Sequence, residues 1–462
     1  MSNDLMQKIV SLCKRRGFVF PGSDIYGGLA NTWDYGPLGV ELKKNVADAW
    51  WKFFVSSRLD MLGLDAAILM NPKVWQASGH VENFNDAQVD CKECKARHRA
   101  DHLIEDVLPD EKVEGLSPEE LTKIIEKNEI KCPKCGKRDF TKARVFNLLF
   151  QTSIGSVEDE TSAVYLRGEL AQGMFVNFKA IQESMRKKLP FGIAQMGRCF
   201  RNEITPGNFI FRTLEFDLME FEYFIHQNEW ENQFEYWLDE MHNWVSFIGL
   251  DKEKTRVREH TKDELSHYSK RTVDIEYETP FGWKEMYGLA YRTDFDLKNH
   301  MEKSGQNMEY LDPYTNEKFI PHVVEPTFGL SRTVLMILLS AYDEEAVPTS
   351  KEGETETRVV MRFAKHLAPF KVAILPLSNK LLDDAKEVWE LLSPHATCDF
   401  DTTGSIGKRY RRQDEIGTPY CVTYDFDSGE DGMVTIRDRD TMEQERVKIT
   451  DLVAYLSEKL AS

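Results

Sequence analysis

The chain has 462 residues, of which 41% are hydrophobic and 29% charged, the composition of a globular protein long enough for two or three domains. Because no run of about 18 apolar residues occurs and the N-terminus lacks an apolar signal core, we expect no membrane partner and a cytoplasmic location. The formal net charge of -18 at pH 7 argues against non-specific coating of nucleic acid, but it allows an RNA partner held by a local basic patch.

The first predicted element is an amphipathic helix over residues 4–17. A glycine-rich stretch, residues 18–39, leads into a helix from about Val40. Its glycine spacing matches neither the dinucleotide-binding nor the P-loop pattern, so we interpret it as a tight loop under packed aromatic side chains. Residues 66–70 then predict a strand that ends in a turn at Pro72.

Two CxxC pairs are the strongest local signal for a metal. The turn within each pair lets two sulfurs converge on one ion, and four thiolates close a tetrahedral site. The segment 88–143 that carries them is charged and partly helical, with Ser117 and Glu120 spaced as a capping box, so a metal would stabilise it. We expect structural zinc in preference to a cluster of reduced thiols or a redox pair. The predicted ligands are Cys91, Cys94, Cys132 and Cys135.

Residues 197–224 predict two strands joined by a loop at Pro206 to Asn208. After the loop, apolar and charged residues alternate over residues 209–224, as in a half-buried antiparallel sheet. Such a hairpin gathers guanidinium and carboxylate groups that suit a polyanion and an amine together, although a salt-bridged exposed sheet face explains them about equally well. The charged side chains concerned are Arg201, Glu203, Arg212, Glu215 and Glu220.

Residues 227–272 predict a mainly helical insertion, and residues 273–299 return to strands. Glu285 in these strands is either a surface charge or a carboxylate that could hold Mg2+. A strand at 322–325 then leads into a strongly apolar helix. Arg332 lies in the first turn of that helix, where the helix dipole disfavours a cation, so this arginine needs an anionic partner.

From residue 362 onward, strands and helices alternate, which indicates a compact α/β domain of about 100 residues. A basic run over residues 408–412 includes one tyrosine. In an acidic protein this run could contact an RNA backbone, or it could be a solvated helix face paired with Asp414 and Glu415. The residues do not separate these two interpretations.

Three segments resemble, in order, the signature motifs of class II aminoacyl-tRNA synthetases, and the wording of RGELAQG and RNEITPGNFIFRTLEF resembles the glycyl branch of that family. The segments are RLDMLGLDAAILMNPKVW for motif 1, GRCFRNEITPGNFIFRTLEFDLMEFEYF for motif 2 and KFIPHVVEPTFGLSRTVLMILLSAYDE for motif 3. The resemblance covers nearly the whole chain. It implies that glycine and ATP form glycyl-adenylate, from which glycine passes to tRNA(Gly).

The resemblance also implies an α+β architecture. A class II antiparallel catalytic sheet flanked by helices would occupy residues 1–361, with a zinc-ribbon-like insertion at 88–143. An α/β anticodon-binding domain would occupy residues 362–462. The expected assembly is a homodimer of the bacterial, eukaryote-like type, joined through the motif 1 region.

Carried over residue by residue, the resemblance implies a catalytic set of Arg201, Glu285 and Arg332, with Mg2+ bridging the ATP phosphates. Arg201 would hold the α-phosphate, Glu203 would accept from the adenine amino group, and Phe216 would stack on the adenine. The implied ATP-binding residues are Arg201, Asn202, Glu203, Phe211, Arg212, Thr213, Leu214, Glu215, Phe216, Glu285, Met286, Gly329, Leu330, Ser331 and Arg332.

For glycine, the resemblance places three acids around the ammonium group, Arg292 near the carboxylate and Arg99 close to the substrate. Because glycine has no side chain, its recognition would rest on the ammonium while larger amino acids are excluded sterically. Thr327 replaces a serine that is common in the family, which keeps the hydroxyl and adds a methyl group. The implied glycine-binding residues are Arg99, Glu169, Phe216, Asp217, Leu218, Met219, Glu220, Arg292, Glu325, Pro326, Thr327, Phe328 and Gly329.

Two alternatives remain. A class IIa synthetase for proline, threonine or serine is disfavoured by the triple-acid pocket and by RGELAQG. A non-catalytic binding module with the same fold is disfavoured because the catalytic arginines and Glu285 are retained. The expected chemistry needs no protein base, since the carboxylate of glycine is ionised at pH 7, so positioning and charge stabilisation should dominate.

Overall fold

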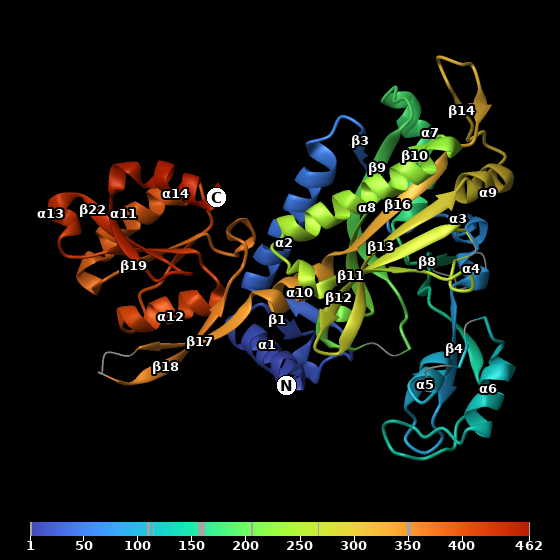
Figure 1. Ribbon diagram of the computed structural model, residues 1–462, viewed down its shortest axis with the longest axis horizontal. Helices are drawn as coiled ribbons and strands as arrows, with labels where there is room; N and C mark the ends of the chain where they lie inside the picture. Colours follow the sequence, from blue (N-terminus) through green and yellow to red (C-terminus); the bar gives the residue numbers. More distant parts are fainter. Residues whose placement is uncertain are drawn as a thin grey trace.

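A seven-stranded sheet forms the centre of the larger part of this computed structural model (Figure 1). Neighbouring strands are antiparallel except for the short edge strand β3, which runs parallel to β9. In sheet order, the strands are β11 (Thr255–Glu259), β12 (Arg271–Thr279), β13 (Gly282–Thr293), β16 (His322–Gly329), β10 (Glu215–Ile225), β9 (Phe191–Phe200) and β3 (Met61–Gly63). The structure describes residues 2–108, 111–113, 115–155, 162–204, 207–266, 268–348 and 353–461.

The antiparallel hairpin predicted over residues 197–224 is confirmed by β9 and β10, in which Leu218 pairs with Gly197. The second strand begins later than predicted, at Glu215, because Phe209–Phe211 form a 3-10 turn. The ring of Phe209 is buried against Trp33, with ring centroids 4.8 Å apart, and this contact turns the chain away from the sheet. Pro206 of the predicted loop lies outside the described residues.

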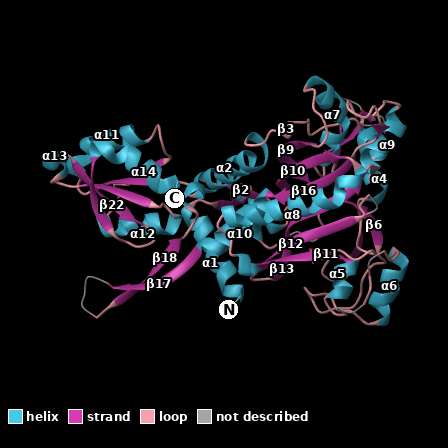
Figure 2. Cartoon of the chain, turned by 45° about the horizontal axis from the view of Figure 1, so that its top comes forward, coloured by secondary structure: helices cyan, strands magenta, loops and turns pink. Residues whose placement is uncertain are grey.

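Side chains alternate between the two faces of the sheet. On β10, Phe221 and Tyr223 belong to a large aromatic core, whereas Phe224 belongs to a second core on the opposite face. Burial of a ring such as Phe221 stabilises the fold by roughly 1.5–3 kcal/mol, so the aromatic core anchors the sheet. Helices α2 (Pro37–Trp51), α8 (Trp230–Phe247) and α10 (Leu330–Ala341) cover the first face, and α7 (Ala171–Ser184) and α9 (Phe295–Ser304) cover the second (Figure 2).

Two predicted elements differ from the structure. The strand predicted at residues 66–70 is wrong: the strand of this region is β3, which pairs with β9. Within the described chain, residues 66–70 form only a single bridge, from Leu69 to Leu166. Residues 227–272 are not simply a helical insertion. They contain β11, which pairs with β12 and forms one edge of the central sheet, so this segment is part of the fold itself.

The chain segment between α4 and α7 contains an arm that projects from the sheet (Figure 1). It has a small apolar core that includes Val89, Ile104 and Leu121, and the predicted capping box of Ser117 and Glu120 is confirmed. Its elements are β4 (Asn85–Asp90), β5 (Arg97–Arg99), α5 (Ala100–Glu105), α6 (Pro118–Lys127) and β6 (Arg144–Asn147).

The C-terminal part is the α/β domain that the alternation of elements predicts. Its sheet has the order β20-β19-β21-β22-β23, with β19 parallel to both β20 and β21. The elements are β19 (Val372–Pro376), α11 (Leu382–Leu392), β20 (Cys398–Phe400), α12 (Ile406–Ile416), β21 (Tyr420–Tyr424), α13 (Ser428–Asp431), β22 (Met433–Asp438), β23 (Gln444–Lys448) and α14 (Leu452–Ala461).

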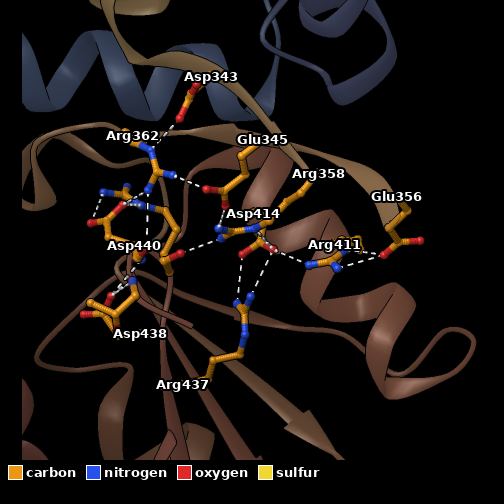
Figure 3. A network of polar contacts seen from close by, with 12 residues as sticks. Asp343, Glu345, Glu356, Arg358, Arg362, Arg411, Asp414, Arg437, Asp438 and Asp440 are labelled. Carbon is orange, nitrogen blue, oxygen red and sulfur yellow. Dashed lines mark hydrogen bonds and ion pairs between the residues drawn. The ribbon is translucent and has the colours of Figure 1, made fainter. Parts of the chain in front are cut away.

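A hairpin and a buried ion network connect the two parts (Figure 3). Arg358 is fully buried and donates from Nε to Asp414 Oδ2 at 2.8 Å, while Nη1 pairs with Glu345. Arg437 holds the other side of the Asp414 carboxylate at 2.9 Å. Because Asp414 lies in α12 and Arg358 in the hairpin, the network fixes the C-terminal domain against the hairpin. The hairpin strands are β17 (Tyr342–Pro348) and β18 (Thr355–Met361).

The remaining elements are short or lie at the periphery. The N-terminal helix is confirmed one or two residues from its predicted ends. Among the described residues, no helix combines the length and apolar character that a membrane span requires. These elements are α1 (Ser2–Arg16), β1 (Val19–Pro21), β2 (Trp33–Tyr35), α3 (Pro72–Ala77), α4 (His80–Asn83), β7 (Gln151–Ser153), β8 (Ala163–Tyr165), β14 (Tyr310–Leu311) and β15 (Lys318–Phe319).

Candidate active site

A cavity of about 440 Å³ opens over the face of the central sheet that carries Glu220. Most of the predicted ATP and glycine residues lie around it, although they come from segments more than 100 residues apart. The predicted residues that line it are Glu169, Arg201, Glu203, Phe211, Arg212, Thr213, Phe216, Asp217, Leu218, Glu220, Glu285, Met286, Glu325, Thr327, Gly329, Ser331 and Arg332.

Three buried carboxylates form one end of the cavity. Glu220 is 2% exposed and accepts from the backbone N–H of Leu170 at 3.0 Å and from the Thr327 hydroxyl at 2.7 Å. Glu169 accepts from Gln172 Nε2 at 2.9 Å. Glu325 completes the group from β16, so this end of the cavity is suited to a small cation such as a primary ammonium.

The pKa of Glu169 is held below its ordinary value. Burial alone would raise the pKa, but His80, with Nε2 at 3.3 Å from Glu169 Oε2, and the guanidinium of Arg292 lower it. In contrast, burial and the charge of Glu169 raise the pKa of Glu220. Glu169 is therefore ionised throughout the neutral range and supplies a fixed negative charge.

Arg292 lies beneath the carboxylates and is 1% exposed. Its guanidinium donates to both oxygens of Asp296, at 2.9 and 3.0 Å, and to Glu325 at 2.8 Å. The ring of Tyr268 covers the guanidinium at 3.9 Å. In this arrangement Arg292 holds Glu325 in place, and the predicted contact between Arg292 and a glycine carboxylate stays a prediction.

Two arginines face the middle and the far end of the cavity. The guanidinium of Arg201 lies between the rings of Phe84 and Phe216, at 5.2 and 5.3 Å, and donates from Nε to the Gly168 carbonyl oxygen at 3.1 Å. Arg332 meets Glu285, whose pKa it lowers. The anionic partner that the first turn of an apolar helix requires is therefore present.

Glu203 and Arg212 lie side by side, with Oε2 and Nε 3.8 Å apart. Burial lowers the pKa of Arg212, and the nearby charges of Arg332 and Arg99 act in the same direction. Several cations that repel one another across one cavity create a site for a polyanion.

Some predicted residues are placed elsewhere. Met219 and Phe328 belong to the aromatic core on the opposite face of the sheet, so their side chains do not reach the cavity. Arg99 lies in the arm, where Asp86 and Asp101 hold its guanidinium, so it does not line the cavity, although its charge acts on Arg212, which does. The other predicted residues outside the cavity lining are Asn202, Leu214, Glu215, Arg292, Pro326 and Leu330.

Nine residues of the lining were not predicted as site residues, and four of these carry titratable side chains. Arg258, His260, Tyr268 and Asp274 come from β11, β12 and the segment between them, and His260 Nε2 lies 2.8 Å from Asp274 Oδ2. No motif surrounds these residues in the sequence. They reach the cavity because β11 and β12 extend the central sheet.

The four predicted cysteine ligands converge in the arm. Their sulfur atoms lie within 4.8 Å of one another, and the Cys91–Cys135 and Cys94–Cys132 pairs are 3.6 and 3.7 Å apart. Two sulfurs of a tetrahedral zinc site with Zn–S bonds of about 2.3 Å are about 3.8 Å apart, whereas a disulfide would need about 2.05 Å. The donor set and its spacing therefore fit zinc.

The two CxxC turns share one geometry. A residue with positive φ follows each second cysteine, namely Lys95 at 58° and Gly136 at 73°. The backbone N–H of Cys94 lowers the pKa of Cys91 to about 7, which favours its thiolate, whereas the neighbouring cysteines raise the pKa of Cys135.

The basic run over residues 408–412 is largely occupied by intramolecular contacts. Arg409 is buried and donates to the Pro376 carbonyl oxygen, Arg411 pairs with Glu356, and Arg412 pairs with Asp401. Arg411 and Arg412 thus form ion pairs, as the helix-face interpretation predicts, and Arg411 also reaches Asp414 at 3.5 Å, whereas Arg409 is buried against backbone oxygens and fits neither interpretation.

Comparisons with known proteins agree with this geometry. A family model described as the tRNA synthetase class II core domain (G, H, P, S and T) matches residues 150–341, and one described as an anticodon binding domain matches residues 371–459. A glycine–tRNA ligase of Geobacillus thermodenitrificans is 57% identical over 460 residues, covering 99% of this chain and 98% of the relative. Those of Geobacillus kaustophilus and Bacillus cereus are 57% and 56% identical, and each alignment covers at least 98% of both chains.

Proposed function

The chain belongs to the glycine–tRNA ligase family of class II aminoacyl-tRNA synthetases, and we propose that its cavity binds ATP and glycine side by side and joins them as glycyl-adenylate. In this reaction a carboxylate oxygen of glycine attacks the α-phosphorus of ATP and pyrophosphate leaves. Transfer of the glycyl group to the terminal adenosine of tRNA(Gly) then releases AMP. One observation carries the proposal: a triple-carboxylate pocket and two arginines share a single cavity.

The amine end supports glycine as the substrate. Glu169, Glu220 and Glu325 would surround the ammonium group and accept its three N–H donors. The Thr327 hydroxyl already donates to Glu220, so the residue that replaces the family's serine keeps that hydrogen bond. An amino acid with a larger side chain would gain no matching contact here and would lose affinity through steric overlap.

The phosphate end supports in-line displacement. Arg201 is fixed by the Gly168 carbonyl oxygen and by two rings, so its charge is preorganised for the α-phosphate. Arg332 and Arg212 would bind the outer phosphates. Since the carboxylate of glycine is already ionised, these side chains would act by positioning and by neutralising charge, without general-base catalysis.

Mg2+ would be held at the phosphate end by Glu285 and Asp274. Both carboxylates line the cavity and offer oxygen ligands of the kind that Mg2+ prefers. When bound, Mg2+ would neutralise charge on the ATP phosphates. Zn2+ would be held by the four arm cysteines as a structural ion, because their four sulfurs complete its coordination.

We further propose a homodimer of the bacterial, eukaryote-like type that forms through the motif 1 region. β3 is an edge strand of the central sheet, and Leu59 beside it is 94% exposed. Such an apolar edge suits a second copy of the chain. A cytoplasmic location is also proposed, supported by the eight described cysteines, none of which is joined in a disulfide.

The activity is tested by ATP–pyrophosphate exchange with a panel of amino acids, followed by aminoacylation of tRNA(Gly). We expect exchange with glycine only. Exchange with proline, threonine or serine would indicate another class IIa specificity, and no exchange with any amino acid would indicate a non-catalytic module. Sedimentation equilibrium of the native protein and of Leu59→Asp tests the dimer, which the substitution should weaken.

A further inference from the structure

Glu222 is a buried acid next to the amine pocket that the proposed mechanism does not use. It lies on β10 two residues after Glu220 and is 0% exposed. No hydrogen-bond donor in the described part of the chain reaches either of its carboxylate oxygens. It also lies outside the lining of the cavity, although it is close to Glu220 and Glu325 of the amine end.

Strand register places Glu222 opposite Glu325. β10 and β16 pair Glu220 with Thr327 and Tyr223 with Val324, so the same antiparallel register sets Glu222 across from Glu325. Carboxylate oxygens of Glu220, Glu222 and Glu325 lie within 4.8 Å of one another. Like charges directly opposite each other on neighbouring strands are destabilising, and burial makes the repulsion stronger.

The surrounding charges cannot neutralise both acids. Arg292 is the cation that faces Glu222 and Glu325, and its donors already engage both oxygens of Asp296 and one oxygen of Glu325. Glu220 is also satisfied as an acceptor, by Leu170 and Thr327. Two buried carboxyl groups in this arrangement share a proton, and it resides on the group that lacks other donors. Burial raises the pKa of both Glu222 and Glu325 well above the ordinary value, and of the two it is Glu222 that accepts from no donor in the described chain, so Glu222 holds the proton.

We propose that Glu222 is a positioning residue of the glycine site, which stays protonated and donates its O–H to Glu325, thereby fixing the carboxylate that receives the glycine ammonium. This inference rests on the proposed function. Glu325 would then be held from two sides, by Arg292 and by Glu222. The remaining carboxylates keep the negative charge that the ammonium requires, while the repulsion between Glu222 and Glu325 is removed.

Three variants test this role by ATP–pyrophosphate exchange. Glu222→Gln keeps a neutral donor, Glu222→Leu removes the donor at similar volume, and Glu220→Gln is a matched control that neutralises an acid of the pocket itself. We expect Glu222→Leu and Glu220→Gln each to raise the KM for glycine by about tenfold or more, the effect of losing a hydrogen bond to a charged group, with little change in the KM for ATP. We expect Glu222→Gln to remain close to the native KM for glycine.

Two results would overturn the proposal. If Glu222→Gln is as impaired as Glu220→Gln, Glu222 is ionised and acts as a direct ligand of the ammonium. If Glu222→Leu binds glycine like the native protein, Glu222 has no role in the site.

Infrared spectroscopy reports the protonation of Glu222 directly. It requires neither enzyme activity nor a folded Glu222→Leu variant. The native protein should show a protonated-carboxyl band that Glu222→Gln lacks, and its absence from the native protein would also overturn the proposal. A native protein that shows the band but no glycine-dependent exchange would instead contradict the proposed function.

Discussion

Arg332 and Glu285 meet across two elements of the central fold: Arg332 Nη1 lies 3.1 Å from Glu285 Oε2 and donates to the Glu285 carbonyl oxygen at 2.9 Å. Arg332 comes from the first turn of α10 and Glu285 from β13. The contact offsets the unfavourable interaction between a cation and the N-terminus of a helix. It also aims the guanidinium across the phosphate end of the cavity.

Arg332→Ala should lower kcat/KM for ATP in the exchange reaction by about 10²- to 10³-fold, because a preorganised charge is lost at the phosphates. Steady-state exchange kinetics at varied ATP measure this effect. Arg271→Ala is the matched control, since Arg271 pairs with Glu259 and Glu235 away from the cavity and should leave the kinetics unchanged. Equal loss in both variants would contradict a local role for Arg332.

Glu169→Gln should raise the KM for glycine by about tenfold or more and leave the KM for ATP nearly unchanged, because a buried charge is removed while the side-chain volume is kept. Exchange kinetics at varied glycine provide the measurement. Glu278→Gln alters an exposed glutamate of β12 and serves as control. A larger effect on the KM for ATP than on the KM for glycine would contradict the placement of Glu169 at the glycine end of the cavity.

Cys94→Ser should abolish binding of one zinc ion per chain and expose the arm, residues 88–143, to proteolysis, because a site with three thiolates no longer closes. Elemental analysis of protein purified without chelator and limited proteolysis test both expectations. Cys398→Ser alters a thiol in the C-terminal domain and should retain the metal. Native protein without bound zinc would refute the metal assignment.

Asp414→Asn should destabilise the native fold by about 3–5 kcal/mol at pH 7, since it leaves two buried arginines without their shared carboxylate. Although burial alone would raise the pKa of Asp414, Arg358 and Arg437 lower it below its ordinary value. The carboxylate of Asp414 therefore stabilises the fold fully above its pKa in the unfolded chain, about 3.9. This stabilisation is lost as the pH falls through the lower pKa that Asp414 has in the folded protein.

Chemical denaturation of the native protein and of Asp414→Asn, at pH 7 and at pH values below about 4, tests this pH dependence. The difference between their free energies of unfolding should become smaller in acid. Asp48→Asn, which breaks an exposed pair with Lys44, should change stability little at either pH. If the difference in free energy of unfolding between the native protein and Asp414→Asn stays constant in acid, the carboxylate charge of Asp414 does not stabilise the fold.

Features that depend on local spacing can be predicted from the amino-acid sequence. Alternation around the loop at Pro206 to Asn208 predicted the β9–β10 hairpin, because side chains on a strand switch faces at each residue. The CxxC spacing predicted four converging sulfurs, since each turn is closed within a few residues. Arg332 in the first turn of an apolar helix predicted an anionic partner, and Glu285 is that partner.

Which distant residues face one another depends on how the whole chain packs. Tyr268 and Asp274 reach the cavity because β11 and β12 join the central sheet, which nothing in their own segment indicates. Met219 turns away from the cavity and Glu222 lies opposite Glu325 because strand register, set by pairing across the sheet, assigns each side chain its face and its neighbour. Register between strands about 100 residues apart depends on packing of the whole sheet, so no local pattern could reveal it.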